Sequence, residues 1–154
     1  MSAIEVIRLT EADWQRFAAL RLRALADSVG TEDAQYVNEM DFSGTQWRRR
    51  LRAHAQFTAA DGDRLIGLIG AQRATAESVY LYSLWTEPAD RRRGVARTLL
   101  AAAVEWAREL RARTVTLRVD PSNTAASSAY AELGFNADET CSAAAEITMT
   151  LVLS

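Results

Sequence analysis

Pro-Ala-Asp-Arg-Arg-Arg-Gly-Val-Ala-Arg, at residues 88–97, is the stretch that decides the fold, because it joins a strand pattern to a helix pattern. An aromatic-rich strand is predicted before it, over residues 79–86, and a helix after it, over residues 95–110. A basic loop between a strand and a helix leaves free N–H groups at the positive end of the helix dipole, which favours an anion such as phosphate. Gly94 lets a ligand approach the backbone, although it also fits a plain tight turn.

Outward from this loop, the composition describes one ordinary domain. The chain has 154 residues, 49% of them hydrophobic, which is enough for a sizeable core and suggests a single domain over residues 1–154. The formal net charge of −2 argues against a general nucleic-acid binder and against a membrane-surface binder. No apolar run approaches the length of a membrane span.

Cysteine usage and the N-terminal residues favour a cytoplasmic protein. Cys141 is the only cysteine, so an intrachain disulfide and a thiolate metal cluster within one chain are excluded, and we expect no metal. A lone thiol fits a reducing compartment. Residues 1–9 lack the basic segment and apolar core of a signal peptide.

The hydrophobic pattern on both sides of the loop predicts a mixed order of elements. Before the loop, it predicts a strand at 4–9, a helix that starts near Thr10 and carries Trp14, Ala18, Leu22 and Leu25 on one face, a loop or short helix at 27–40, a helix that starts at Ser43, and a hairpin at 56–72. After the loop and its helix, it predicts a strand at 114–119, a helix at 123–133 that ends at Gly134, and a strand at 147–153. This order predicts an α/β or α+β domain of three layers with a mixed sheet.

The helix predicted after Pro121 has an unusual polar face. Asn123, Ala126, Ser127 and Tyr130 recur at i, i+3, i+4 and i+7, so they share one stripe. A stripe that packs into a core would carry Leu, Ile or Val, whereas this one places small residues between two hydrogen-bonding ends about 10 Å apart. Such a stripe suits a slender polar arm lying along the helix. Asn123 alone also fits an N-cap, and Tyr130 alone also fits a core aromatic.

Two motifs in this order resemble those of the GCN5-related N-acetyltransferases, the GNAT superfamily. Residues 91–96 fit the (Gln/Arg)-x-x-Gly-x-(Gly/Ala) loop, and residues 123–135 resemble the Asn-x-x-Ala-x-x-x-Tyr helix with its Leu-Gly-Phe ending. The resemblance covers residues 79–135 at the level of motifs and the rest of the chain at the level of pattern. It implies a single GNAT domain with a mixed, mostly antiparallel sheet of about six to seven strands flanked by about four helices.

The resemblance also implies acetyl-CoA as the cosubstrate, no metal, and a set of binding residues. In the family, amides of the loop hold the pyrophosphate, and the strand before the loop bonds the pantetheine arm through its backbone. The residues that match the strand and the loop are Leu84, Trp85, Thr86, Arg91, Arg92, Arg93, Gly94, Val95, Ala96 and Arg97. Asn123 would bond the arm through its side chain, and Tyr130 would lie near the thioester sulfur.

The implied reaction is direct attack of a primary amine, of a small molecule or a peptide, on the acetyl thioester in a ternary complex. A backbone N–H of residues 84–86 would polarise the thioester carbonyl, and Tyr130 would assist the leaving thiolate. The general base stays open, because the family's glutamate position falls on Tyr80, and Glu77, Glu39 or a water chain are the candidates. The alternative is a GNAT-fold module that binds acyl-CoA without turnover. The sequence does not identify the acceptor amine. For the oligomeric state, a homodimer is the default expectation.

Overall fold

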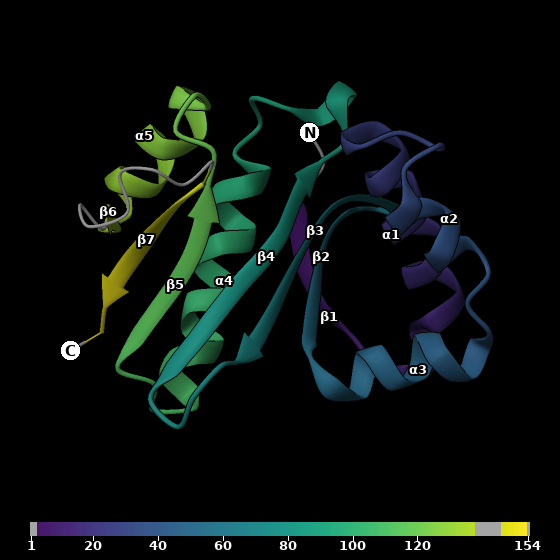
Figure 1. Cartoon of the computed structure of the whole chain (residues 1–154), viewed down its shortest axis with the longest axis horizontal. Helices are drawn as coiled ribbons and strands as arrows, with labels where there is room; N and C mark the ends of the chain where they lie inside the picture. Colours follow the sequence, from purple (N-terminus) through teal and green to yellow (C-terminus); the bar gives the residue numbers. More distant parts are fainter. Residues whose placement is uncertain (1–2, 138–145, 154) are drawn as a thin grey trace. The chain divides into compact units, whose positions relative to one another are not determined.

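The computed structural model describes residues 3–137 and 146–153, and Cys141 lies outside them. Seven strands of the described chain hydrogen-bond in the order β1-β2-β3-β4-β5-β7-β6 (Figure 1). The strands are β1 (Ile4–Leu9), β2 (Ala55–Asp61), β3 (Arg64–Arg73), β4 (Ser78–Thr86), β5 (Thr114–Val119), β6 (Asn136–Ala137) and β7 (Ile147–Val152). The helices are α1 (Trp14–Ser28), α2 (Ala34–Met40), α3 (Gly44–Ala53), α4 (Val95–Glu109) and α5 (Thr124–Glu132), with 3-10 turns η1 (Glu11–Asp13) and η2 (Pro88–Asp90).

The pairing of the strands confirms the predicted mixed α/β sheet. β4 and β5 pair parallel, whereas β1 with β2, β5 with β7, and β6 with β7 pair antiparallel. A parallel pair needs a crossover connection, which α4 supplies between β4 and β5. The described residues form five α-helices where about four were expected, because the stretch predicted as a loop or short helix contains α2. Among the described helices, none combines the length and apolarity needed to cross a bilayer.

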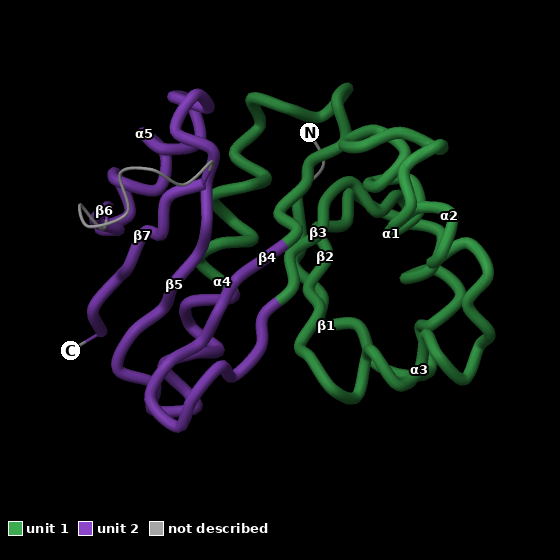
Figure 2. The backbone as a smooth tube through the Cα atoms, in the orientation of Figure 1, with its two compact units in different colours: residues 1–70, 83–102 green, residues 71–82, 103–154 purple. Residues whose placement is uncertain are grey.

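The chain divides into two compact units, coloured separately in Figure 2. Unit 1 contains Met1–Gly70 and Ser83–Ala102, and unit 2 contains Ala71–Tyr82 and Ala103–Ser154. β3, β4 and α4 each contribute residues to both units. The two sequence motifs are therefore divided: the basic loop belongs to unit 1 and the polar stripe of α5 to unit 2.

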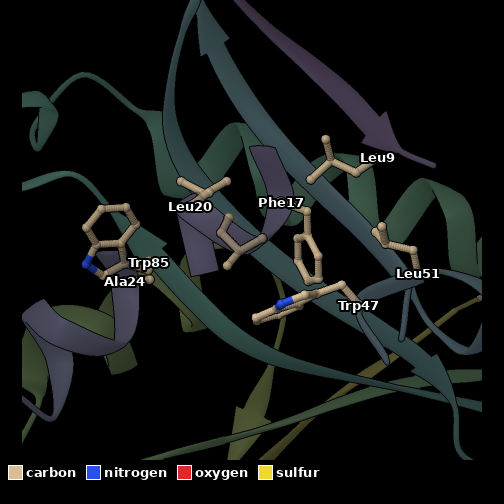
Figure 3. Close-up of a cluster of buried hydrophobic side chains, with 8 residues drawn as sticks. Leu9, Phe17, Leu20, Ala24, Trp47, Leu51 and Trp85 are labelled. Atoms are coloured by element: carbon tan, nitrogen blue, oxygen red, sulfur yellow. The ribbon is translucent and has the colours of Figure 1, made fainter. Parts of the chain in front are cut away.

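In unit 1, α1 and α3 pack against one face of the strands. Figure 3 shows the buried cluster, which contains Leu9 of β1, Phe17, Leu20 and Ala24 of α1, Trp47 and Leu51 of α3, Leu68 of β3 and Trp85 of β4. The rings of Phe17 and Trp47 meet edge to face, with their centroids 5.6 Å apart. Burying two aromatic side chains in one contact is a large apolar contribution, and it joins α1 to α3 in unit 1.

The buried face of α1 differs from the predicted stripe. The buried side chains are Phe17, Leu20, Arg21, Ala24 and Leu25, whereas Trp14, Ala18 and Leu22 pack at the edge of the cluster. The Trp14 ring lies over the backbone of Gly44, where a Cβ would come within 2.9 Å of it, and beside the Arg48 guanidinium. The large indole is thus used to join α1 to the start of α3, and the smaller Phe17 and Leu20 fill the centre.

The first two turns of α4 cover the opposite face of β3 in unit 1. A Cβ on Gly67 would lie 2.9 Å from Leu99 Cδ1 and 2.9 Å from Val95 Cγ1. The next residue, Leu68, belongs to the cluster under α1, and successive residues of a strand point to opposite faces. Unit 1 therefore has the predicted three layers of helix, strand and helix. The close approach at Gly67 brings the first residue of α4, Val95, against β3.

Unit 2 contains the parallel pairing and the C-terminal strands. Residues 78–80 of β4 pair with residues 114–116 of β5, and β5 pairs along its whole length with β7. Gly134, at φ +102°, follows α5, and the Phe135 ring packs with its centroid 6.1 Å from that of Tyr130. The strand, the helix and the helix-ending glycine predicted for residues 114–134 are confirmed. β6 was missed because a two-residue strand has no periodicity.

Both predicted N-terminal helix starts are confirmed. Ser43 Oγ accepts a hydrogen bond from the Gln46 N–H at 3.3 Å, and Gln46 Oε1 accepts from the Ser43 N–H at 2.8 Å. Asp13 Oδ2 accepts from the Thr10 N–H at 2.8 Å. These contacts satisfy N–H groups that a helix leaves unpaired at its first turn, so they set the starts of α3 and of the helical segment that leads into α1.

Candidate active site

The basic loop between η2 and α4 has a turned backbone. Arg92 has φ +69° and Gly94 has φ +78°. A left-handed conformation costs a residue such as Arg92 about 1–2 kcal/mol, so the neighbouring parts of the loop must hold it in place. Turns of this kind aim successive N–H groups in one direction and form concavities that bind anions. A Cβ on Gly94 would meet nothing within 4 Å, so the backbone there is open to a ligand.

The first turn of α4 continues this loop. Val95, Ala96 and Arg97 open the helix, and the first N–H groups of a helix have no partner within it. The Thr98 N–H and the Thr98 hydroxyl both donate to the Gly94 carbonyl, at 3.0 and 2.8 Å, which closes the first turn. The positive end of the α4 dipole therefore lies at the loop, as the sequence predicts, in a geometry that suits a phosphate group.

A buried carboxylate, Asp90, holds the loop. The Asp90 side chain is 5% exposed, its Oδ1 accepts from Arg93 Nη1 at 2.6 Å, and its Oδ2 accepts from Arg64 Nη2 at 2.8 Å. Arg93 Nη2 also donates to Asp61 Oδ2 at 3.1 Å, which ties the loop to the β2–β3 hairpin. The Arg93 side chain therefore serves the structure of the loop, and its backbone is the part suited to bind an anion.

Arg91 is also engaged within unit 1. Its Nε donates to the Thr86 carbonyl at 3.2 Å and its Nη2 donates to Asp27 Oδ2 at 3.1 Å. The same Asp27 oxygen accepts from Trp85 Nε1 at 2.8 Å. Because the Trp85 side chain is buried and its N–H is already bonded, only the backbone of Trp85 is free to bind a ligand. Arg92, in contrast, is exposed and has no hydrogen-bond or ion-pair partner among the described residues. Of these three arginines, Arg92 is the one whose side chain is available to an anion.

Strand β4 has an irregular backbone at Ser83, one residue before the segment at 84–86. Ser83 has φ +57° inside the strand, which is rare for a residue other than glycine. The ladder that joins β4 to β5 in the described chain consists of three pairs, at residues 78–80 of β4. Beyond Ser83, the Glu87 N–H donates to the Ile66 carbonyl at 2.8 Å, so the end of β4 lies beside β3. Such an irregularity re-aims the backbone groups of the residues that follow it, here Leu84 and Thr86.

Helix α5 carries the polar stripe in unit 2. Asn123 is its N-cap, with Oδ1 accepting from the Ala126 N–H at 3.1 Å, and this use leaves the side-chain Nδ2 group as a donor. Ser127 Oγ is buried and has no hydrogen-bond partner among the described residues. A buried hydroxyl without a partner costs about 1–3 kcal/mol. A polar ligand arm along this face would supply the missing partner, so the stripe fits the arm of a pantetheine.

Tyr130 lies at the end of the same stripe. Its side chain is buried against Phe135, and burial raises the pKa of the Tyr130 hydroxyl above its usual value of 10.0. The hydroxyl is therefore protonated throughout the neutral range. At that pH it can donate a hydrogen bond to a ligand that reaches it.

Glu77 lies in the exposed turn between β3 and β4. Its side chain is 66% exposed, and its Oε1 lies 3.6 Å from Arg113 Nε. The register places the start of β4 beside Thr114 at the start of β5, whereas Asn123 and α5 follow the other end of β5 (Figure 1). The six residues of β5 separate these ends by about 16 Å. Glu77 and the beginning of α5 are thus at opposite ends of β5.

Glu39 is buried among cationic side chains in unit 1. Its side chain is 3% exposed, and Oε1 accepts from Arg21 Nε at 3.1 Å and from Arg50 Nη1 at 2.7 Å. Oε2 accepts from Arg21 Nη2 at 3.3 Å and from Gln35 Nε2 at 3.1 Å. Burial alone would raise the pKa of Glu39, but the hydrogen bonds and charges of Arg21 and Arg50 outweigh it and lower the pKa. A carboxylate held ionised with both oxygens occupied is a poor general base.

Three residues near these groups, Asp90, Ser127 and Ser83, were given no role of their own from the sequence. Asp90 is an acidic residue beside a basic run, and this charge contrast is a signal that points to an ion pair. Ser127 was counted in the stripe of α5 without a role of its own. Ser83 has no signal, because its left-handed backbone depends on contacts with distant residues. Within residues 3–137 and 146–153, no cluster of three or more His, Cys, Asp or Glu side chains is arranged to hold a metal ion.

Comparison with known families identifies the class of protein. Residues 14–135 match the family model described as acetyltransferase (GNAT) family, and this chain belongs to that family. The match covers both motifs and the elements between them. Acyl transfer from acetyl-CoA is the activity of this family, so the chain is a transferase of the acetyltransferase class. No curated protein sequence matched the chain.

Solved structures of GNAT proteins have the same fold. The PaiA N-acetyltransferase from Thermoplasma acidophilum, in complex with coenzyme A, aligns with a TM-score of 0.77 at 17% identity over 98% of this chain and 99% of that one. A GNAT-family acetyltransferase from Streptococcus pneumoniae aligns at 0.77 and 16% identity over 98% and 100%. The ribosomal-protein-alanine N-acetyltransferase from Brucella melitensis aligns at 0.74 and 20% identity over 97% and 99%. At these identities the likeness establishes the fold.

Proposed function

We propose that this chain transfers the acetyl group of acetyl-CoA to a primary amine by direct attack within a ternary complex. The observation that carries the proposal is the loop before α4, where left-handed Arg92 and Gly94 leave an open backbone at the positive end of the helix. Family membership supports acetyl-CoA as the donor. The amine belongs to a small molecule or to a peptide, and the protein acts as a single cytoplasmic domain, with a homodimer as the default assembly.

The proposed cofactor contacts follow the two motifs. The N–H groups of residues 92–97 bind the pyrophosphate, and the exposed Arg92 side chain adds positive charge. The backbone of residues 84–86 bonds the pantetheine arm, and Asn123 Nδ2 and Ser127 Oγ bond the arm from the α5 stripe. Ser127 supports this assignment because a ligand would satisfy its buried hydroxyl.

The chemistry assigned to the protein is polarisation and hydrogen bonding. Acetyl-CoA supplies an activated thioester, and a backbone N–H of residues 84–86 stabilises the negative charge that develops on its carbonyl oxygen. Tyr130 donates a hydrogen bond to the departing sulfur. Full proton transfer from a phenol near pKa 10 to a thiolate whose acid has a pKa near 8.5 is uphill by roughly 2 kcal/mol, and the raised pKa of Tyr130 makes it more so. We therefore assign Tyr130 a hydrogen bond in the transition state. The attacking nitrogen becomes cationic when it bonds to the acetyl carbon, and the proton that it loses to become the amide neutralises the departing thiolate.

No carboxylate is assigned as the general base. The acceptor amine must lose a proton before it attacks, since an alkylammonium titrates near ~10.4. Glu39 is ionised and fully hydrogen-bonded, and Glu77 lies beside Arg113 at the far end of β5 from the start of α5. We propose that water carries the proton away, so that the rate follows the ionisation of the amine itself.

The proposal is tested by binding and turnover of the same preparation. Calorimetry with CoA measures binding, and release of free CoA thiol across a panel of small amines, aminoglycosides and peptides measures transfer. Binding with amine-dependent thiol release is the expected result. Absence of CoA binding would overturn the proposal, and tight binding without turnover across the panel would favour a module that senses acyl-CoA.

A further inference from the structure

A buried ionic network in unit 1 ends on a single hydroxyl of β4. Arg21 Nη1 donates to Ser83 Oγ at 2.8 Å, while Nε and Nη2 of the same guanidinium donate to the two oxygens of Glu39. Arg50 Nη1 adds a bond of 2.7 Å to Glu39. The network therefore connects α1, α2 and α3 to β4 at the residue before the proposed pantetheine strand.

The hydroxyl at the end of this network belongs to the one residue of β4 with a left-handed backbone. Ser83 has φ +57°, a conformation that a serine keeps only where the surrounding structure imposes it. A hydrogen bond from a charged donor is stronger than one between neutral groups, so the Arg21 bond is suited to this task. The backbone groups of residues 84–86 follow directly and take their direction from Ser83.

The network contributes little net stability, but it fixes the orientation of the Arg21 guanidinium. A buried ion pair contributes little net stability, because desolvation of both charges offsets their attraction. The Arg21 and Glu39 side chains are 9% and 3% exposed, so desolvation is nearly complete. A planar guanidinium held by two oxygens of one carboxylate has a fixed orientation, and its remaining nitrogen is thereby aimed at Ser83.

We propose that Glu39 is a positioning residue for acetyl transfer: it orients Arg21, Arg21 holds Ser83, and Ser83 directs the backbone of residues 84–86 toward the acetyl thioester. This inference rests on the proposed function. It gives the buried carboxylate a role that does not involve the transferred proton, in agreement with its occupied oxygens.

The test compares three variants with a matched control. Glu39→Gln removes the charge that orients Arg21, Ser83→Ala removes the hydroxyl, and Ser83→Gly removes the hydroxyl but tolerates positive φ without strain. Leu51→Ala is the control, because Leu51 is buried in the same unit and its apolar side chain takes no part in the hydrogen bonds of the network. The measurements are kcat, the calorimetric Kd for CoA, the pH profile of kcat, and amide hydrogen exchange at residues 84–86.

Positioning predicts a common pattern. Glu39→Gln and Ser83→Ala lower kcat by about 10- to 100-fold, the range expected from a displacement of about 1 Å. Both variants speed amide exchange at residues 84–86 beyond the Leu51→Ala control. The Kd for CoA changes by less than about 3-fold, because the pyrophosphate is held elsewhere. Ser83→Gly retains more activity than Ser83→Ala, and the pH profile of Glu39→Gln keeps its acidic limb.

Other results overturn the inference. Loss of the acidic limb in Glu39→Gln alone would make Glu39 a general base, and kcat and exchange equal to those of the control would make the network merely structural. If the wild-type chain binds no CoA, the proposed function fails, and exchange at residues 84–86 still decides whether Glu39 and Ser83 fix this strand.

Discussion

Arg93 Nη1 lies 2.6 Å from Oδ1 of the buried Asp90, three residues earlier in the chain. This pair braces the proposed phosphate loop from within, and the second oxygen of Asp90 binds Arg64 at the start of β3. Such a brace keeps the backbone N–H groups of the loop in one arrangement, so that binding an anion need not order them.

Asp90→Asn will weaken acetyl-CoA binding. The amide keeps one acceptor oxygen but loses the charge that holds two guanidinium groups, so the loop becomes mobile. We expect the KM for acetyl-CoA to rise about 10-fold, equivalent to about 1.4 kcal/mol, with kcat changed much less. Asp63→Asn is the control, since Asp63 is an exposed carboxylate in the adjacent β2–β3 turn. An equal rise in KM for both variants would contradict the role of Asp90.

Gly94→Ala separates backbone strain from ligand binding. The new Cβ would meet no atom within 4 Å, so the effect comes from φ +78°, which an alanine tolerates at a cost of about 1–2 kcal/mol. Gly62→Ala is closely matched, because Gly62 has φ +61°, also has open space, and lies in the β2–β3 turn. We expect both variants to lose similar thermal stability and Gly94→Ala alone to bind CoA more weakly. Calorimetry and thermal unfolding of the two proteins check this.

Patterns that repeat along the chain were predictable from the sequence. The starts of α3 and of the η1–α1 segment follow from capping residues, and β5 and α5 follow from periodicity with Gly134 as the stop. The loop at residues 91–97 could also be predicted from the sequence, because a strand, a basic turn and a helix occur in immediate succession. These features depend on residues that are neighbours in sequence.

Features that depend on distant residues were not predictable. The left-handed Ser83 is held by Arg21, which is 62 residues away in sequence. Arg91 and Arg93 add positive charge to the basic loop, and the structure shows that their side chains pair with Asp27, Asp61 and Asp90. The charges in a sequence do not reveal which arginine pairs with a carboxylate and which is left exposed. Only the tertiary structure shows these pairings.

Tyr130→Phe will lower kcat without weakening CoA binding. The hydroxyl has no hydrogen-bond partner among the described residues, so its removal leaves the protein's own contacts intact. Loss of one hydrogen bond to a developing thiolate is expected to reduce kcat about 10- to 100-fold. Because burial raises the pKa of Tyr130, the hydroxyl stays protonated in neutral solution, and the ratio of wild-type to variant kcat will be constant from about pH 6 to pH 9. A ratio that falls steadily over this range would contradict the assignment.

Gly67→Ala will destabilise unit 1 by overpacking. The added methyl would lie 2.9 Å from Leu99 Cδ1 and from Val95 Cγ1, closer than carbon atoms approach in a packed core. We expect the free energy of unfolding to fall by about 1–3 kcal/mol in denaturant titration. Combining it with Leu99→Ala, which removes one of the clashing groups, will cost less than the sum of the two single changes. Additive losses would show that α4 does not approach β3 as closely as described.

Glu39 gives unit 1 an acid-sensitive contribution to stability. Arg21 and Arg50 outweigh burial and lower the pKa of Glu39, so the folded state binds its proton more weakly than the unfolded chain. This contribution is fully present above the unfolded pKa near 4.5 and is lost as the pH falls through the lower folded value. Glu39→Gln has no such group, and its disadvantage relative to wild type will therefore shrink as the pH is lowered from about 6 to about 3. Denaturant unfolding at several pH values measures the difference, with Glu5→Gln on the exposed face of β1 as the control that should follow wild type. A gap between wild type and Glu39→Gln that is independent of pH would mean that packing, and not charge, is what Glu39 contributes.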